Sequence, residues 1–232
     1  MLTRRHLCCG AAVTAAAVAS IRASHAAECT AFTSESQQAL SPAEAVQRLR
    51  DGNARFVAGQ MMNCDLIEQV HATAGGQAPF AAVLGCIDSR VPPELVFDQG
   101  VGDLFVARIA GNFANTDIMG SLEFATAVAG ARAIVVLGHS ACGAIRGAID
   151  DVDLGLLTAT LANIKPAVRA VAPEGGSSSD AALVQDVADV NVGMTVAKLQ
   201  VESSVLGGLV ADGKLAIVGA MHDITTGKVT FL

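Results

Sequence analysis

Three residues in the chain, Cys86, His139 and Cys142, combine side-chain types that hold metal ions in proteins. Two thiolates and an imidazole form the soft sulfur and nitrogen set that suits zinc. His139 and Cys142 are three positions apart, so both can reach one ion from a single loop or helix start. A structural zinc site normally has four protein ligands, whereas three leave a position for water. We therefore predict one Zn²⁺ per chain, at a site where zinc would acidify a bound water to give a hydroxide nucleophile.

Two other interpretations of these residues stay open. His71 or His222 could complete a closed structural site, although each fits an ordinary surface or core position as well. Cys86 and Cys142 could instead form a disulfide. That pairing would leave His139 and the charged residues after Cys86 without a role, so the pattern favours the metal.

Asp88 and Arg90 follow Cys86 at two-residue intervals. On an extended segment such residues point to the same side, and a guanidinium grips a carboxylate with a fixed fork. The pair would hold Asp88 ionised and turned toward the water at the metal, and without Arg90 the carboxylate could become a fourth ligand. A simple surface salt bridge is the alternative.

Short apolar runs predict the strands that must position these residues. Such runs are typical of strands buried on both faces of a parallel sheet, and they alternate with helical stretches, which indicates an α/β fold. The predicted strands cover 80–85, 104–109, 133–138 and 215–220, and the predicted helices begin at Pro42 after a Ser41–Glu44 capping box and cover 117–129, 156–172 (bent at Pro166) and 180–206, followed by a hairpin at 224–231. Because ligands bind beyond the carboxyl ends of parallel strands, Cys86 and His139 are expected at one edge of the sheet.

Composition narrows the class of protein. Hydrophobic residues make up 52% and charged residues 16% of the 232 positions, which excludes a disordered chain. The net charge of −7 and the absence of Trp and Tyr argue against nucleic acid as a partner. We expect one catalytic domain over residues 41–232, preceded by a loose lead-in at 27–40.

Residues 1–26 have the pattern of a signal peptide. Arg4 and Arg5 precede a small-residue apolar run from Leu7 to Ser20, and the arginine pair resembles a twin-arginine signal. A membrane anchor is the alternative, but the run is shorter than a bilayer span requires. We therefore expect export to the periplasm, with no stable membrane anchor after signal removal. Cys29 and Cys64 could pair in such a compartment, which spacing alone cannot show.

The two metal motifs together resemble those of the β-class carbonic anhydrases. They are Cys86-Ile-Asp88-Ser-Arg90 and His139-Ser-Ala-Cys142, and the resemblance extends over about Ser41 to Leu232. It implies a mostly parallel sheet flanked by helices, zinc held by Cys86, His139 and Cys142, and an Asp88–Arg90 dyad. It also implies reversible hydration of carbon dioxide to bicarbonate and a proton, in a homodimer or higher homo-oligomer.

The same resemblance assigns the substrate pocket. It implies that Gln77 donates a hydrogen bond to substrate and that Phe105 and Ala110 line an apolar pocket, where the alternatives are a solvated Gln and ordinary core residues. The chain departs from the family at Ile109, where Asn is frequent, and near Phe124 and His222, where a Tyr is frequent. Two rival functions remain: hydrolysis of carbon disulfide or carbonyl sulfide, and non-catalytic zinc binding or thiol redox activity.

Overall fold

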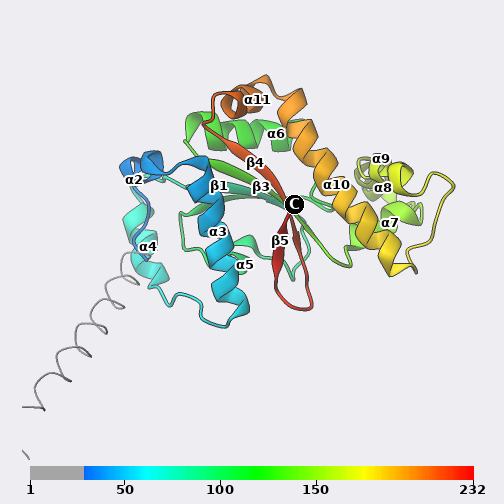
Figure 1. Cartoon of the computed structure of the whole chain (residues 1–232), viewed down its shortest axis with the longest axis horizontal. Coiled ribbons are helices and arrows are strands. Elements are labelled where there is room, and N and C mark those ends of the chain that lie inside the picture. The colour runs from blue at the N-terminus through cyan, green and yellow to red at the C-terminus, as the bar shows by residue number, and fades with distance from the viewer. Residues whose placement is uncertain (1–28) are drawn as a thin grey trace, which may run out of the picture.

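The computed structural model describes residues 29–232, in which helices flank a five-stranded sheet (Figure 1). The strand order is β2-β1-β3-β4-β5, with β1 to β4 parallel and β5 antiparallel to β4. The strands are β1 (Ala81–Gly85), β2 (Leu104–Arg108), β3 (Ala133–His139), β4 (Ala216–His222) and β5 (Val229–Phe231). The predicted mostly parallel α/β fold is confirmed, and so is the terminal hairpin.

Alternate side chains of the central strands serve two separate cores. In β3, Ile134 and Val136 pack into one core, whereas Val135 and Leu137 pack into the other. This two-residue period follows from the pleat of a strand. All seven residues of β3 are buried, which explains why its sequence is a continuous apolar run.

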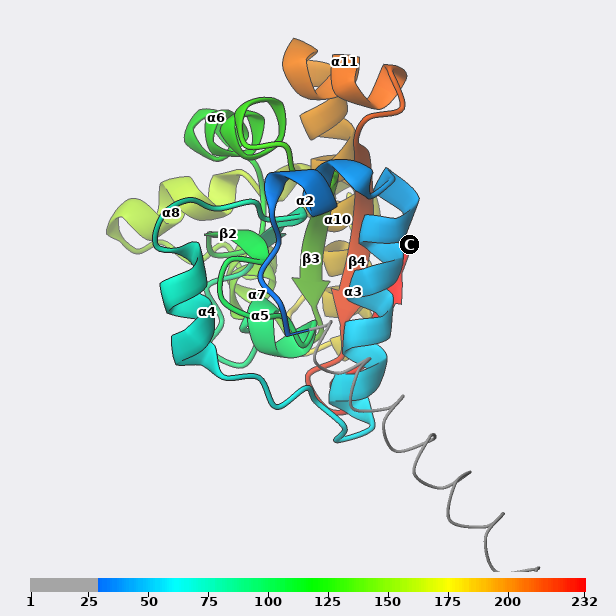
Figure 2. The ribbon, with the colours of Figure 1, turned by 90° about the vertical axis from the view of Figure 1, so that its left-hand side faces the viewer.

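Helices cover both faces of the sheet (Figures 1 and 2). Residues of α3 and α5 pack into one core, and residues of α6 to α11 pack into the other. The helices are α2 (Ser34–Ala39), α3 (Pro42–Val57), α4 (Leu66–Thr73), α5 (Pro93–Val96), α6 (Thr116–Glu123), α7 (Gly143–Ile149), α8 (Gly155–Ala162), α9 (Lys165–Val171), α10 (Ala181–Glu202) and α11 (Ser204–Ala211), with a π-helical turn at Phe124–Val128. The capping box of α3 is present as predicted.

Two predicted helices are each divided in the structure. The stretch expected to bend at Pro166 is two helices, α8 and α9, because Pro166 lies in the first turn of α9, where a missing N–H costs nothing. The long helix ends at Glu202. Ser203 then adopts an extended backbone, and its hydroxyl accepts a hydrogen bond from Leu206 N–H as the cap of α11.

The lead-in was expected to be loose, and this was wrong for its described part. Residues 34–39 form α2, and the buried Gln37 donates hydrogen bonds of 2.7 Å to the carbonyls of Pro79 and Ala129. A disulfide joins Cys29 to Cys64. The predicted signal peptide lies outside the described residues. Over 29–232, the helices are too short or too polar for any of them to span a bilayer.

Candidate metal centre

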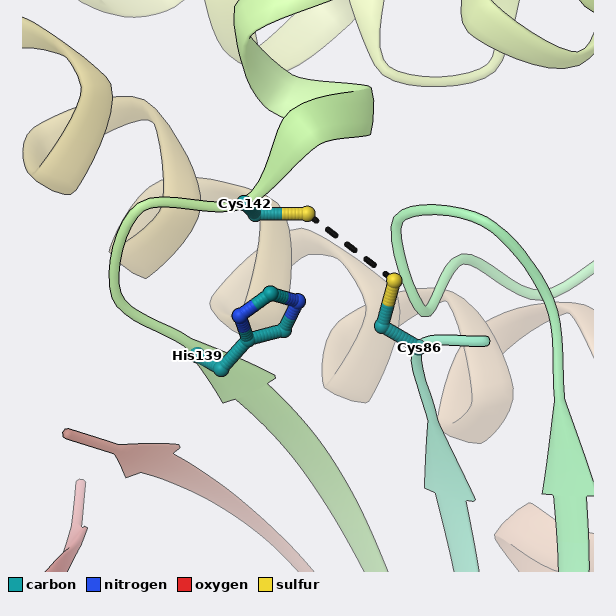
Figure 3. Close-up of side chains that lie close together, drawn as sticks. All are labelled: Cys86, His139 and Cys142. Atoms are coloured by element: carbon teal, nitrogen blue, oxygen red, sulfur yellow. Dashed lines mark hydrogen bonds between the residues drawn. The ribbon is translucent and has the colours of Figure 1, made fainter. Parts of the chain in front are cut away.

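The three predicted ligands meet at the carboxyl ends of two neighbouring parallel strands (Figure 3). Cys86 follows β1, His139 is the last residue of β3, and Cys142 lies directly before α7. Their ligand atoms all lie within 4.8 Å of one another, with the two sulfurs 3.9 Å apart, and all three side chains are buried. Cys86 and Cys142 are free thiols, so the alternative of a disulfide between them does not hold.

The His139 ring is oriented for metal binding. Its Nδ1 lies 3.0 Å from the Ser140 carbonyl oxygen, which can only accept, so Nδ1 carries the proton. In the neutral ring that binds a metal, Nε2 is then the acceptor, and this atom is fully buried without a hydrogen-bond partner in the described residues. An orphaned acceptor beside two thiols fits a bound zinc ion, because ligating histidines usually donate their other nitrogen to a carbonyl in this way.

The two thiols are arranged so that one ionises readily. The hydrogen bond from Cys142 lowers the pKa of Cys86 well below the ordinary thiol value, and contacts with His139 and the Gly111 N–H act in the same direction. The pKa of Cys142 is raised, first by its hydrogen bond to Cys86 and then by burial. A coordinating metal deprotonates its thiol ligands outright, so the pair suits a cation that replaces the shared proton.

A strained turn brings Cys142 back to His139. Between them, Ala141 has a φ of 53°, in the left-handed region that favours glycine. A residue with a Cβ pays on the order of 1 kcal/mol for this conformation. The strain lies at the metal site, where surrounding structure can hold an unfavourable backbone in place.

Asp88 and Arg90 form the predicted ion pair at the edge of the site. Arg90 Nε and Nη2 donate to the two carboxylate oxygens at 2.9 and 2.7 Å, and the Arg90 N–H donates to Oδ1 at 3.0 Å. These bonds hold the pKa of Asp88 well below its usual range, and those from the Arg90 side chain contribute most. Asp88 Oδ2 lies 3.9 Å from His139 Nε2, so the carboxylate faces the metal position.

A cavity of about 310 Å³ opens beside Cys86 and Asp88. Its remaining wall is mostly apolar and comes from Ile87, Ala110, Gly143, Ala144, Gly147, Val152, Leu157 and Leu161. Ala110 therefore lines the cavity beside Cys86, whereas its contact with substrate stays a prediction. A small uncharged molecule would fit this wall, in which Asp88 supplies the charged side chain and Cys86 the thiol.

Two residues predicted to contact substrate, Gln77 and Phe105, lie away from the cavity beside Cys86. Gln77 is exposed and precedes β1, at the opposite end of that strand from Cys86. Phe105 lies in β2 and lines a different cavity, of about 710 Å³, in which its ring packs edge-on against Phe124 at 6.1 Å. A single chain does not bring either residue to the metal ligands.

Neither additional histidine joins the ligand group. His71 is exposed in the last turn of α4. His222 pairs with His139 in the register of β4 and β3 and is buried, yet it lies outside the group of atoms within 4.8 Å. Burial lowers the pKa of His222, and the neighbouring His139 adds to this. Within residues 29–232, the group of clustered ligand atoms therefore comes from Cys86, His139 and Cys142.

Sequence reasoning missed three residues around Cys86. Arg108 donates to the Cys86 and Asp88 carbonyls at 2.8 and 2.5 Å. Gly111 N–H donates to Cys86 Sγ at 3.4 Å, and the buried Asn191 of α10 donates to the Gly111 carbonyl at 2.9 Å. A polar residue in the apolar stretch of α10 was the available signal for Asn191, but its partner is 80 positions away.

Comparison with known proteins agrees with this geometry. The carbonic anhydrase family model matches residues 81–229. Carbonic anhydrase 2 of Mycobacterium tuberculosis is 37% identical over 81% of this chain and 91% of its own length, and the carbonic anhydrase of Mycolicibacterium smegmatis is 38% identical over 82% and 92%. A tetrameric β-carbonic anhydrase of the ascomycete Sordaria macrospora superposes with a TM-score of 0.63, at 31% identity over 71% of this chain and 89% of that one. The chain belongs to the carbonic anhydrase family, in its β class.

Proposed function

We propose that this chain catalyses the reversible hydration of carbon dioxide to bicarbonate and a proton. Family membership supports the reaction. The observation that carries the proposal is the small, mostly apolar cavity beside the three ligands and Asp88. Carbon dioxide is small and uncharged, so apolar walls can accept it, whereas the charged product gains more from water.

The roles of the residues follow from their positions. Cys86, His139 and Cys142 would hold zinc, which when bound supplies a Lewis acid that brings the pKa of water near neutrality. Asp88 accepts a hydrogen bond from the attacking water and so orients its lone pair. Arg90 keeps Asp88 ionised and fixes its direction through two side-chain hydrogen bonds. Ala110 and the apolar wall hold the substrate.

Stopped-flow hydration assays across pH, with zinc measured on the same sample, test this proposal. We expect activity that scales with zinc content and is lost in Cys86→Ser. Carbon disulfide and carbonyl sulfide assayed on the same preparation decide between this reaction and the rival hydrolase. Zinc-loaded protein without hydration activity at any pH would indicate a non-catalytic zinc-binding protein and overturn the proposal.

We also propose that the active form is a homo-oligomer. The outer edge of β2 has no partner strand within residues 29–232, and half-exposed Phe124 lines the cavity beside it with Phe105. The related enzyme from Sordaria macrospora is tetrameric. Because Gln77 is a strand's length from Cys86, contact between Gln77 and substrate would need the site of a second copy. Sedimentation tests this: the wild type should be an oligomer, and Phe124→Glu should weaken its assembly. A fully active wild-type monomer would contradict the proposal.

Export to the periplasm is a further proposal. Residues 1–26 have the pattern of a twin-arginine signal, and the Cys29–Cys64 disulfide fits an oxidising compartment. That route carries folded proteins, so zinc could be loaded before the free thiols meet an oxidant. Replacing Arg4 and Arg5 with Lys should leave the enzyme in the cytoplasm. Unchanged export in cell fractionation would count against the twin-arginine route.

A further inference from the structure

The segment that carries Cys86 and Asp88 leaves the sheet just where Arg108 ends β2. The last bond between the two strands runs from Ile109 N–H to the Gly85 carbonyl at 3.0 Å. Beyond this bond, the Arg108 side chain makes the contacts between the two segments. Its Nε lies 2.8 Å from the Cys86 carbonyl oxygen, and its Nη2 lies 2.5 Å from the Asp88 carbonyl oxygen. The guanidinium of Arg108 thus links the end of β2 to the backbone of Cys86, a metal ligand, and to the backbone of Asp88.

The two backbone carbonyls that Arg108 contacts differ in whether a second hydrogen-bond donor reaches them. The Asp88 carbonyl also accepts from Val91 N–H at 3.1 Å. The Cys86 carbonyl accepts from Arg108, and no second donor to it lies within residues 29–232. Removing the guanidinium would therefore free the backbone at Cys86 first. An arginine suits this position because its planar fork has donors at fixed angles, whereas a lysine ammonium is a single flexible point.

We propose that Arg108 is a positioning residue for the metal centre. It holds the backbone of Cys86 and Asp88 so that the thiolate and the carboxylate keep one fixed separation. Outer-shell partners of this kind typically change metal affinity or activity by roughly tenfold to a hundredfold when they are removed. The effect on catalysis rests on the proposed function, whereas the effect on zinc affinity does not.

The chain contains a matched control for this arrangement. Arg132 also bridges two nearby backbone carbonyls, with Nη2 2.9 Å from that of Gln38 and Nε 3.5 Å from that of Gln37. It directly precedes β3, at the end of that strand opposite His139. Arg132→Met therefore removes a comparable clamp without touching the site.

The experiment compares full-length Arg108→Met, Arg108→Lys, Arg108→Ala and Arg132→Met with the wild type. Zinc affinity is measured by competition with a chelator, folding by circular dichroism, and kcat and KM by stopped-flow hydration. We expect Arg108→Met to bind zinc about tenfold to a hundredfold more weakly and to lose kcat with little change in KM. Arg108→Lys should recover only part of this. Millimolar guanidinium should restore part of the zinc affinity and kcat of Arg108→Ala, and Arg132→Met should retain wild-type values for both.

Several outcomes would overturn the assignment. Wild-type zinc affinity and kcat in folded Arg108→Met would do so, as would an equal loss in Arg132→Met. If Arg108→Met does not fold, Arg108→Lys and the guanidinium rescue decide, and full function in Arg108→Lys or the absence of rescue contradicts the proposal. If wild-type protein binds zinc but does not hydrate carbon dioxide, the proposed function fails, and the zinc affinities still decide the role of Arg108.

Discussion

A single added methyl group at Gly111 should disturb the metal centre. The Gly111 N–H donates to Cys86 Sγ at 3.4 Å, and the φ of this residue is +85°. A Cβ at this position would lie 2.4 Å from Cδ1 and 3.2 Å from Cγ1 of the fully buried Ile164. Gly111→Ala therefore combines backbone strain with a clash, in contact with a ligand.

The cost can be estimated from these two terms. The left-handed conformation costs a non-glycine residue roughly 1–2 kcal/mol. Overpacking of a filled core adds roughly 1–3 kcal/mol. Together the free energy of unfolding should fall by about 2–5 kcal/mol, a large part of the 5–15 kcal/mol typical of a domain. Movement of the Gly111 N–H should also weaken zinc binding.

Urea unfolding at fixed protein and zinc concentrations measures the loss, and chelator competition measures zinc affinity. Gly208→Ala is the control, because a Cβ there meets nothing within 4 Å and the residue lies in α11. It should stabilise the protein by about 0.5–1 kcal/mol. Ile164→Val removes the clashing Cδ1, so the double variant with Gly111→Ala should be more stable than the sum of the single losses, by roughly 0.5–3 kcal/mol.

Two results would refute this reasoning. If Gly111→Ala is as stable as Gly208→Ala, neither the clash nor the strain is present. If the two losses in Gly111→Ala and Ile164→Val simply add, the destabilisation does not come from the contact with Ile164.

Three further predictions concern other parts of the chain. Asp88→Asn should lower kcat roughly a hundredfold or more while zinc content stays unchanged, because the amide cannot act as the ionised acceptor; full activity in the stopped-flow assay would exclude that role. Cys64→Ser opens the disulfide to Cys29, whose sequence separation of 35 predicts a loss of about 4 kcal/mol in urea unfolding, and equal stability of reduced and oxidised wild type would contradict it. Burial raises the pKa of Asp103, so the folded state binds more protons than the unfolded one and stability should fall as pH rises from about 4 through the raised pKa, then level off. Asp103→Asn keeps an acceptor for the Gly100 N–H and should remove this slope from melting temperatures measured against pH, and a slope that persists would assign it to another group.

The sequence predicted the metal ligands because each lies at the end of a pattern that local residues create. FAAVLG and AIVVLG are buried strands by composition, and parallel neighbours end at the same edge of the sheet. Cys86 and His139 therefore had to approach one another. The Asp88–Arg90 pair could also be predicted from a short window, because residues two apart on an extended segment share a side.

The breaks in the helices were harder to place from the sequence. The residues 156–172 have an apolar character that fits one bent helix as well as two shorter ones. Pro166 was the local signal, but its effect depended on whether it lay within a helix or in the first turn of a new one. The π-helical turn after α6 gave no signal that single-residue propensities could detect.

Sequence alone thus determined the chemistry of the centre: the soft ligands and the paired carboxylate beside them. Tertiary structure alone decided what holds the centre in place and which residues face its cavity. Arg108 reaches Cys86 across 22 positions, Asn191 reaches Gly111 across 80, and Gln77 and Phe105 lie away from the ligands of their own chain. The physical reason is that side-chain type and strand pattern are encoded in short windows, whereas a hydrogen bond between distant segments exists only once the strand order has placed them together.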